Sequence, residues 1–273
     1  MNTVSPLRTA YSQFRVTVSE FLAFKDLLWL WTMREVRVRY KQSVLGTAWA
    51  ILQPLALAAM FTLVFSLIVK VPTGTLPYPL YSYTAVLVWT LLSGGITSGI
   101  NSLINNMNLV GKIYFPREIL PMATIAAALV DFVVAGSGVV VLLAWYRWPI
   151  HVTALWMIPL IALLLMIMTG LTLMGSAAIV YYRDFRFLVP LALQLWFYGS
   201  PIIYPVDLVP EDFRSLYALN PLVGILSGIR DALLLGKMPD LRLLLPALAL
   251  GPVVLMSGYV VFKRAERGFA DVI

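Results

Sequence analysis

The fold is decided by the stretch MREVRVRYKQSVLGTAWAILQPLALAAMFTLVFSLIV, which runs from Met33 to Val69. It changes abruptly from arginines to hydrocarbon, and no charged residue lies between Gln42 and Val69. At about 1.5 Å of rise per residue, a helix over this run exceeds the roughly 30 Å core of a bilayer. The stretch therefore predicts a membrane-spanning helix.

The sidedness of this first span follows from the basic residues that precede it, Arg34, Arg37, Arg39 and Lys41. Short basic flanks stay on the cytoplasmic side, because moving them across the bilayer is unfavourable. We therefore expect the first span to run outward. Residues 1–41 form a cytoplasmic lead-in that ends in an amphipathic interface helix from Phe24 to Lys41, because apolar residues recur at helical spacing there.

The composition extends this interpretation to the whole chain. Of its 273 residues, 60% are hydrophobic, which leaves too few polar side chains to coat a soluble globule of this length. The net charge of +7 comes from basic residues near the ends of apolar runs, so membrane lipids are the expected partner and nucleic acid is not. The chain has no cysteine and hence no thiolate chemistry.

Five more spans are predicted beyond the first. They cover about 80–103, 121–146 and 154–180, a stretch that starts near Leu188, and about 243–262. The fifth contains Pro190, Gly199, Pro201 and Pro205, so its outer half is expected to be bent or broken. Residues 42–273 thus form one all-α integral membrane domain of six transmembrane helices, with both termini cytoplasmic.

The segment Val206–Arg242 carries two helix signals but no full span. Pro210 with the acids after it starts one helix, and Asn220 followed by Pro221 starts another that ends at Gly236. From Pro221 to Leu235 a helix is only about 22 Å long, so we predict short re-entrant helices. This topology leaves six of the 20 basic residues outside and 14 inside; those outside are Lys70, Arg147, Arg214, Arg230, Lys237 and Arg242.

The chain shows no motif for chemistry of its own. A phosphate-binding G-x-x-x-x-G-K-[ST] loop does not occur, since Ile113 follows Gly111-Lys112 and Asn106 stands in the place of the first glycine. His151 is the sole histidine, which excludes a histidine-based metal site. We therefore expect no catalytic, cofactor-binding or metal-binding residues on this chain.

One loop and one acid are candidates for function. Between the second and third spans, Lys112, Arg117 and Glu118 surround Tyr114 and Phe115 in a compact cytoplasmic loop that a partner is expected to grip. Asp131 is the acid predicted inside a span, where a carboxylate is costly to desolvate. It either hydrogen-bonds to a neighbouring helix or subunit while protonated, or belongs to a conducting path.

Aromatic residues gather at the outer halves of three spans. Those of the fifth are Trp196, Phe197, Tyr198 and Tyr204, and those at comparable depth on the first two are Phe61, Phe65, Tyr81 and Tyr83. One interpretation is a belt of aromatic rings at the membrane interface. The other is the lining of a channel, and the two stay open at this point.

Several segments together resemble the transmembrane subunits of polysaccharide and polyol-phosphate ABC exporters, and within them the O-antigen export permeases. The resemblance runs from about residue 24 to the end. It rests on YKQSVLGTAWAILQP (40–54), IYFPREILP (113–121), YGSPIIYP (198–205), LVPEDFRSLYALNPLVGILSGIRDALL (208–234) and ERGFADVI (266–273).

The resemblance implies a homodimer in the cell inner membrane, with two copies of a separate cytoplasmic ATPase that binds ATP and Mg. A lipid-linked glycan would move outward through the dimer interface. Residues 24–41 match an interface helix, residues 105–121 match a coupling helix seated in the ATPase, and residues 206–235 match outer gate helices. The gate residues implied are Pro210, Phe213, Asn220, Pro221 and Arg230.

Three alternatives remain. The chain is a permease for capsule or teichoic acid within the same family, a passive channel or scramblase without an ATPase, or a membrane enzyme acting on polyprenyl-linked sugars. An enzyme of that kind would need paired acids, whereas the cytoplasmic acids Glu118, Asp184 and Glu266 are widely separated in the sequence.

Overall fold

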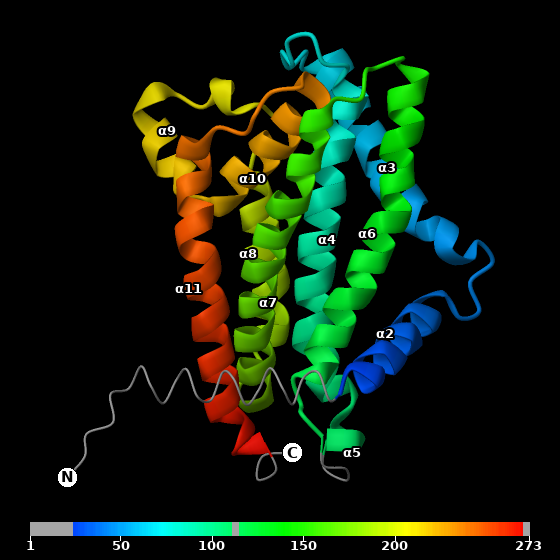
Figure 1. Ribbon diagram of the computed structural model, residues 1–273, viewed down its shortest axis with the longest axis vertical. Helices are drawn as coiled ribbons and strands as arrows, with labels where there is room; N and C mark the ends of the chain where they lie inside the picture. Colours follow the sequence, from blue (N-terminus) through cyan, green and yellow to red (C-terminus); the bar gives the residue numbers. More distant parts are fainter. Residues whose placement is uncertain (1–23, 111–114, 270–273) are drawn as a thin grey trace.

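The computed structural model describes residues 24–110 and 115–269, and within these ranges it contains helices and no strand (Figure 1). The long helices form an upright bundle. The α-helices are α2 (Lys25–Tyr40), α3 (Trp49–Phe61), α4 (Tyr78–Asn105), α5 (Met107–Val110), α6 (Ile119–Trp145), α7 (Met157–Tyr181), α8 (Phe185–Tyr198), α9 (Glu211–Ala218), α10 (Pro221–Arg230) and α11 (Leu241–Glu266). Short 3-10 or π-helical pieces are Gly46–Ala48, Thr62–Ile68, Val152–Trp156, Val206–Leu208 and Asp231–Leu235.

Five helical stretches of the described chain are long and apolar enough to cross a membrane. They are Gly46–Ile68, Tyr78–Asn105, Ile119–Trp145, Val152–Tyr181 and Leu241–Glu266. These correspond to five of the six predicted spans, with ends that differ by a few residues. The chain is therefore a multi-pass membrane protein with an all-helical fold.

The structure differs from the prediction at the fifth span. Its helix α8 has 14 residues, which is about 21 Å, and it ends at Gly199, where the chain enters turns that lead to Pro205. The predicted break at these prolines is confirmed, but a full-length helix is not present. A sixth span by length is instead the pair Glu211–Ala218 and Pro221–Leu235, which is bent by 98°.

The two helix starts predicted in this bent pair are confirmed. The side chain of Asn220 accepts a hydrogen bond from the backbone N–H of Leu222, and Pro221 is the first helical residue. The helical segment ends at Gly236, whose φ of +66° is the left-handed conformation that glycine adopts without strain. The two helices of the bent pair therefore form a sharp corner in the chain between α8 and α11.

The core of the bundle is α4, which packs on α6 and α7 and is the most buried of the candidate spans. Glycines let other helices approach closely. A Cβ atom on Gly258 of α11 would lie 2.2 Å from the carbonyl oxygen of Gly170 on α7, so these two backbones touch. Close contact through small residues is typical of helix pairs in membranes, where apolar burial gives no advantage over lipid.

The interface helix is confirmed as a helix, α2, but its two-faced pattern is wrong. Leu27 and Trp31 pack against the buried cluster that contains Phe115 and Phe262. Trp29 and Leu30 are nevertheless 62% and 65% exposed. Apolar residues thus lie on two sides of α2, one for the bundle and one for the surrounding interface.

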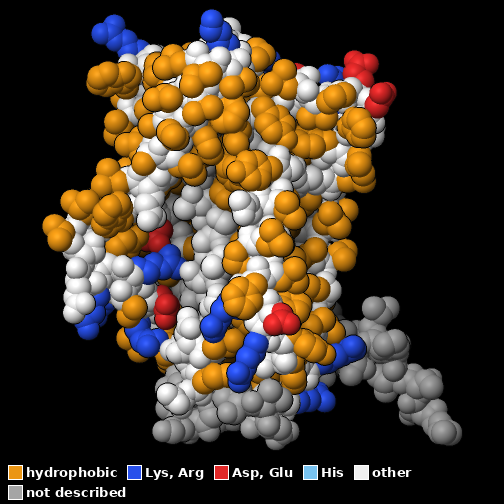
Figure 2. Space-filling view, turned by 180° about the vertical axis from the view of Figure 1, so that it is seen from behind, with side chains coloured by type: hydrophobic (Ala, Val, Ile, Leu, Met, Phe, Trp, Pro, Cys, Tyr) orange, Lys and Arg blue, Asp and Glu red, His pale blue; other side chains and the backbone are white. Residues whose placement is uncertain are grey.

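The two ends of the bundle differ in charge. Figure 1 places α2, α5 and the last turn of α11 at one end, and α9 with the connection before α4 at the other. Figure 2 shows more lysine and arginine side chains toward the first of these ends. We call it the basic end and its opposite the distal end. Basic residues face the cytoplasm in membrane proteins, so the basic end is the expected cytoplasmic one.

This assignment predicts that the second arm of the bent pair, Pro221–Leu235, is reached from outside the cell at both of its ends. Leu219→Cys and Lys237→Cys in this cysteine-free chain should each react with a membrane-impermeant thiol reagent on intact cells. Arg183→Cys, at the exposed turn before α8, should react only after permeabilisation. Reaction of Lys237→Cys only after permeabilisation would show that the bent pair crosses the membrane.

Candidate functional site

The predicted functional residues fall into three regions of the bundle: a cavity beside α2, a cluster at the basic end and a network at the distal end. Lys112 and Tyr114 lie outside the described residues. The interface-helix residues Arg37 and Lys41 are exposed. Arg34 donates to the side-chain oxygen of Asn106 at 3.2 Å and lies over the ring of Trp31, which ties α2 to the end of α4.

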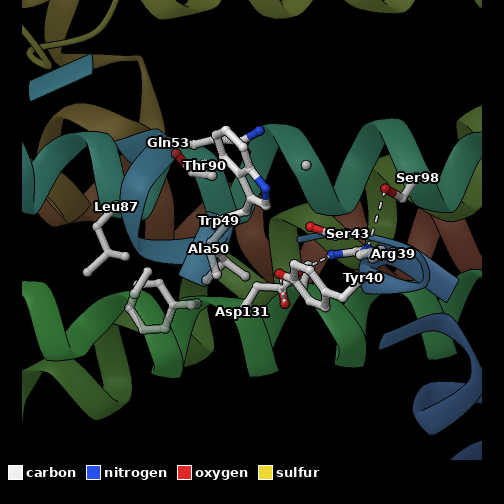
Figure 3. Close-up of a pocket in the computed structure, with 15 residues that line it drawn as sticks. Arg39, Tyr40, Ser43, Trp49, Ala50, Gln53, Leu87, Thr90, Ser98 and Asp131 are labelled. Carbon is white, nitrogen blue, oxygen red and sulfur yellow. Dashed lines mark hydrogen bonds and ion pairs between the residues drawn. The ribbon is translucent and has the colours of Figure 1, made fainter. Parts of the chain in front are cut away.

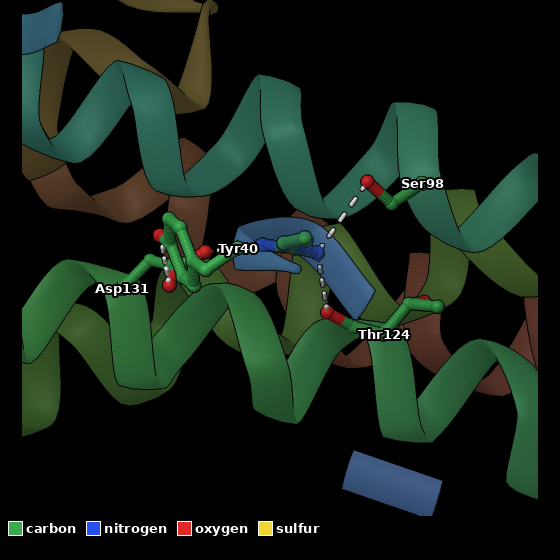
Figure 4. Close-up of polar contacts among 5 residues, drawn as sticks. Tyr40, Ser98, Thr124 and Asp131 are labelled. Atoms are coloured by element: carbon green, nitrogen blue, oxygen red, sulfur yellow. Dashed lines mark hydrogen bonds and ion pairs between the residues drawn. The ribbon is translucent and has the colours of Figure 1, made fainter. Parts of the chain in front are cut away.

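Asp131 of α6 is held by two neighbouring residues at the end of α2 (Figures 3 and 4). Arg39 forms an ion pair with its Oδ2 atom, and the hydroxyl of Tyr40 donates to its Oδ1 atom at 2.7 Å. Burial, followed by the hydrogen bond to Asp131, raises the pKa of Tyr40 above its usual value, so the hydroxyl stays protonated and remains a donor. An intramembrane acid is thus paired with a base from the interface helix.

This partner was missed from the sequence. Arg39 lies 92 residues from Asp131 and was predicted to face the membrane surface with the other basic residues of α2. The second terminal nitrogen of Arg39 is also 3.5 Å from both the hydroxyl of Ser98 and the carbonyl oxygen of Thr124 (Figure 4). The pairing joins α2 to α4 and α6 across the start of the first span.

The ion pair borders a cavity of about 560 Å³. Its walls come from the end of α2, the beginning of α3, and the middle of α4 and α6, as Figure 3 shows. The polar lining residues are Arg39, Tyr40, Ser43, Gln53, Thr90, Ser98 and Asp131. The side chains of Arg39 and Asp131 are 26% and 21% exposed, so neither is sealed from the cavity.

At the basic end, charged residues of the predicted coupling loop turn toward α11. Glu118 is only 4% exposed, and its Oε1 atom lies 2.6 Å from the Nζ atom of Lys263. The same nitrogen lies 3.1 Å from Glu266. The two acids that were expected to lie apart therefore share one lysine, and that expectation is wrong.

Arg117 and Phe115 complete this basic-end cluster. The guanidinium group of Arg117 donates to the backbone oxygen of Glu266 at 2.6 Å and lies 5.7 Å from the ring centre of Phe269. Phe115 is 7% exposed and packs in the same buried cluster as Phe269. The described part of the loop is thus fixed to the end of the last span.

At the distal end, side chains satisfy the carbonyl groups of the break after α8. Asn220 donates to the carbonyl oxygen of Gly199 at 2.8 Å, and Tyr78 donates to that of Ile203 at 2.8 Å. Arg230 donates to the carbonyl oxygens of Pro201 at 2.6 Å and Ile202 at 3.0 Å. The broken chain has no helical partners for these oxygens, and an unpaired carbonyl in a membrane is costly.

Arg230 is the centre of this distal network. It is 5% exposed, and it also donates to the carbonyl oxygen of Tyr81, at 3.2 Å from one terminal nitrogen. Its guanidinium carbon lies 3.4 Å from the centre of the Tyr81 ring, which is a cation–π contact. The other predicted gate residues lie on α9, on α10 or directly before them: Pro210 precedes α9, Phe213 is exposed on α9, and Pro221 begins α10.

The predicted aromatic residues divide into two groups. Tyr81 and Tyr83 are buried, and the hydroxyl of Tyr83 donates to the carbonyl oxygen of Ala135 at 2.7 Å. Four of the others, Phe61, Phe65, Trp196 and Phe197, form a run of ring contacts with Trp89, which was missed because it lies within a charge-free stretch. Their ring centres are 5.3 Å (Trp89 to Phe197), 6.4 Å (Trp89 to Trp196), 5.9 Å (Phe61 to Phe197) and 6.1 Å (Phe61 to Phe65) apart.

Tyr198 and Tyr204 lie at the outer edge of this aromatic group. Tyr198 is 59% exposed, and its backbone oxygen accepts a hydrogen bond from the hydroxyl of Tyr204 at 2.9 Å. Trp196 instead donates its indole N–H to the side chain of Asn220 at 2.9 Å. Tyr198 is therefore the member of the group that is most free to meet a ligand or lipid.

We predict that Arg230→Lys destabilises the protein by about 3 kcal/mol, because a lysine ammonium group cannot span the three carbonyl groups or stack on Tyr81. The thermal unfolding midpoint of the purified chain in detergent measures this loss. Arg242→Lys is the matched control, since Arg242 is exposed at the start of α11. Equal midpoints for both variants would contradict the role given to Arg230.

Comparison with known proteins identifies the family. Residues 26–234 match the model of the ABC-2 type transporter family. The O-antigen export system permease protein RfbA of Klebsiella pneumoniae is 28% identical over 249 residues, which is 91% of this chain and 95% of the relative. The protein of the same name from Myxococcus xanthus is 28% identical over 261 residues, covering 93% and 98%.

A more distant relative has a different named cargo. The polysialic acid transport protein KpsM of Escherichia coli is 22% identical over 213 residues, or 76% of this chain and 81% of the relative. In the described chain, no group of three histidine, cysteine, aspartate or glutamate residues is placed to hold a metal ion. The family model covers well over half of the sequence, and the resemblance inferred from the sequence motifs is confirmed: the chain belongs to the ABC-2 type transporter membrane family.

Proposed function

We propose that this chain is the membrane subunit of an ATP-driven exporter that moves a lipid-linked polysaccharide of the O-antigen type from the cytoplasmic to the outer side of the cell inner membrane. The observation that carries the proposal is the family membership, with relatives along nearly the whole chain that are named O-antigen export permeases. The chain has no phosphate-binding loop, so ATP and Mg would be bound by a separate ATPase. Two chains and two ATPase subunits would form the complex.

The cargo class is the least specific part of the proposal. A capsule exporter is the second candidate, and the observation that favours it is the match to a polysialic acid transport protein.

The membrane-enzyme alternative is weaker. Lys263 forms ion pairs with both Glu118 and Glu266, and Glu118 is buried, so this acid pair is not arranged for general acid–base work on a lipid-bound sugar.

In this proposal, the basic-end cluster transmits movement of the ATPase to the last membrane span. The predicted coupling loop is seated on the partner, and its described residues Arg117 and Glu118 are bonded to the end of α11. A push on the loop would therefore move the last span with it. In this proposal, Arg117 and Glu118 transmit movement within the chain, and the rest of the loop touches the ATPase.

A double-mutant cycle tests this coupling. Glu118→Gln and Lys263→Met should each lower the amount of glycan exported per ATP hydrolysed by the assembled complex, severalfold in each case. Because Glu118 acts through Lys263, whereas Lys263 also pairs with Glu266, the double variant should be no worse than Lys263→Met alone. Additive losses would contradict coupling through this pair. Glu211, whose exposed carboxylate lies 3.6 Å from Arg214 at the distal end, is the control, and Glu211→Gln should leave the ratio unchanged.

The aromatic group supplies a path for the polymer. Conduction requires binding that is favourable enough to admit each sugar and weak enough to release it, and flat aromatic faces offer weak contacts of that kind. In this proposal Tyr198 faces the channel of the dimer, with Trp196 and Tyr204 behind it. The alternative, an interfacial belt, places the same rings against lipid headgroups.

We predict that Tyr198→Ala lowers glycan export per folded molecule severalfold, whereas Tyr198→Phe, which keeps the aromatic face, retains it. Tyr198 is largely exposed, so the fold should tolerate both changes. Phe187→Ala removes an aromatic ring that is 77% exposed at the other end of α8 and serves as the control. Export by Tyr198→Ala that matches the unaltered protein, after correction for membrane abundance, would favour the belt.

A further inference from the structure

The cavity beside Asp131 is a polar space within apolar helices, and the proposed transport path does not use it. Figure 2 shows the flank of the molecule hollowed, with acidic and basic side chains in the hollow. The volume of about 560 Å³ lies within the range of ligand pockets, roughly 300–1,000 Å³, and exceeds the roughly 30 Å³ of one water molecule many times. The cavity is large enough for a headgroup together with its water.

The walls of the cavity reach from the basic-end side of the bundle to about the middle of α6. It is lined by the last residues of α2 and by Trp49, Ala50 and Gln53 at the beginning of the first span. Asp131 lies 12 residues after the start of α6, which is about 18 Å along that helix. A lining with charged and polar groups at this depth favours a polar occupant over hydrocarbon.

The charges in the cavity select the kind of polar group. Arg39 and Asp131 pair with each other, and each stays partly open to the cavity. A phosphate group alone would bind Arg39 but place a second negative charge beside Asp131 without adding a cation. A headgroup with one phosphate and one ammonium group satisfies both residues, because the phosphate accepts from Arg39 while the ammonium donates to Asp131.

From this charge complementarity we infer that the cavity is a binding site for a zwitterionic phospholipid headgroup of the phosphoethanolamine class, taken sideways from the cytoplasmic leaflet. The ammonium group has N–H donors for Asp131, which a choline headgroup lacks. The indole of Trp49 and the ring of Tyr40 border the site, where amphipathic rings suit the junction of headgroup and acyl chain. Such a lipid would bridge Arg39 of α2 and Asp131 of α6 and so hold α2 against the bundle. When the lipid leaves, Arg39 and Asp131 pair with each other again.

Lipid competition tests the inference on the purified full-length chain. The protein is exchanged into equimolar mixtures of phosphatidylethanolamine, phosphatidylglycerol and phosphatidylcholine with identical acyl chains, and retained lipids are counted by native mass spectrometry. We expect one phosphatidylethanolamine per chain, preferred about tenfold over each competitor because it alone bonds both charges. Equal retention of the three lipids, no retained lipid, or preference for phosphatidylglycerol or an added polyprenyl phosphate would overturn the inference.

Two glycines provide a matched pair that leaves the charges in place. A Cβ atom on Gly94 meets nothing within 4 Å, and Gly94 lines the cavity, so Gly94→Leu fills it without disturbing the backbone. Gly136 is equally open but does not line the cavity. Gly94→Leu should lose the retained phosphatidylethanolamine and Gly136→Leu should keep it; retention by Gly94→Leu would overturn the inference.

A second pair of variants tests the charges. Arg39→Gln with Asp131→Asn removes both charges while keeping polar side chains, and it should abolish the preference for phosphatidylethanolamine over phosphatidylglycerol. Asp184→Asn with Arg186→Gln removes an acid and a base from exposed positions around the start of α8 and should leave the preference unchanged. A preserved preference in the first double variant contradicts the inference. Should that variant fail to fold, the competition on the unaltered chain and the glycine pair still decide.

Discussion

Hydrocarbon offers no hydrogen bonds, so each backbone carbonyl that leaves a helix inside the membrane needs a partner from the same protein. After α8 the chain leaves helical geometry between Gly199 and Pro205. Three side chains from other elements supply the donors there: Asn220 before α10, Arg230 at its end and Tyr78 at the start of α4. The corner formed by α8, α9 and α10 depends on these bonds, because α8 itself has few neighbours in the bundle.

The burial of Arg230 follows from the same constraint. No carboxylate lies within ion-pair distance of it in the described chain, and its charge is offset by carbonyl dipoles and by the face of Tyr81. A planar group with five donors suits several carbonyl oxygens that converge from two directions. At the basic end, buried charge is balanced by ion pairs and not by carbonyl groups. There Lys263 and two acids form ion pairs, close to an end of the bundle where several charged side chains remain exposed.

The long spans and the helix starts at Asn220 and Pro221 could be predicted from the sequence, because each depends on residues that are neighbours along the chain. The length of α8 could not, since prolines and Gly199 signal a break without showing where the helix stops. The contacts of Asp131, Glu118 and Arg230 could not be predicted from the sequence either. Arg39 lies 92 residues from Asp131, Lys263 lies 145 residues from Glu118, and Tyr81 lies 149 residues from Arg230. A single sequence does not reveal such pairings.

The contact of Arg230 with Tyr81 also bears on how the protein is made. A chain entering the membrane during synthesis presents α4 early and Arg230 only after another 149 residues. Until then the carbonyl groups after α8 have no guanidinium donor, and α8 is too short to settle across the bilayer alone. The corner between α8 and Leu235 is therefore complete only once Arg230 has been synthesised and has met α4. Contacts of such long sequence separation form late, so this corner belongs to the last part of the fold to be assembled.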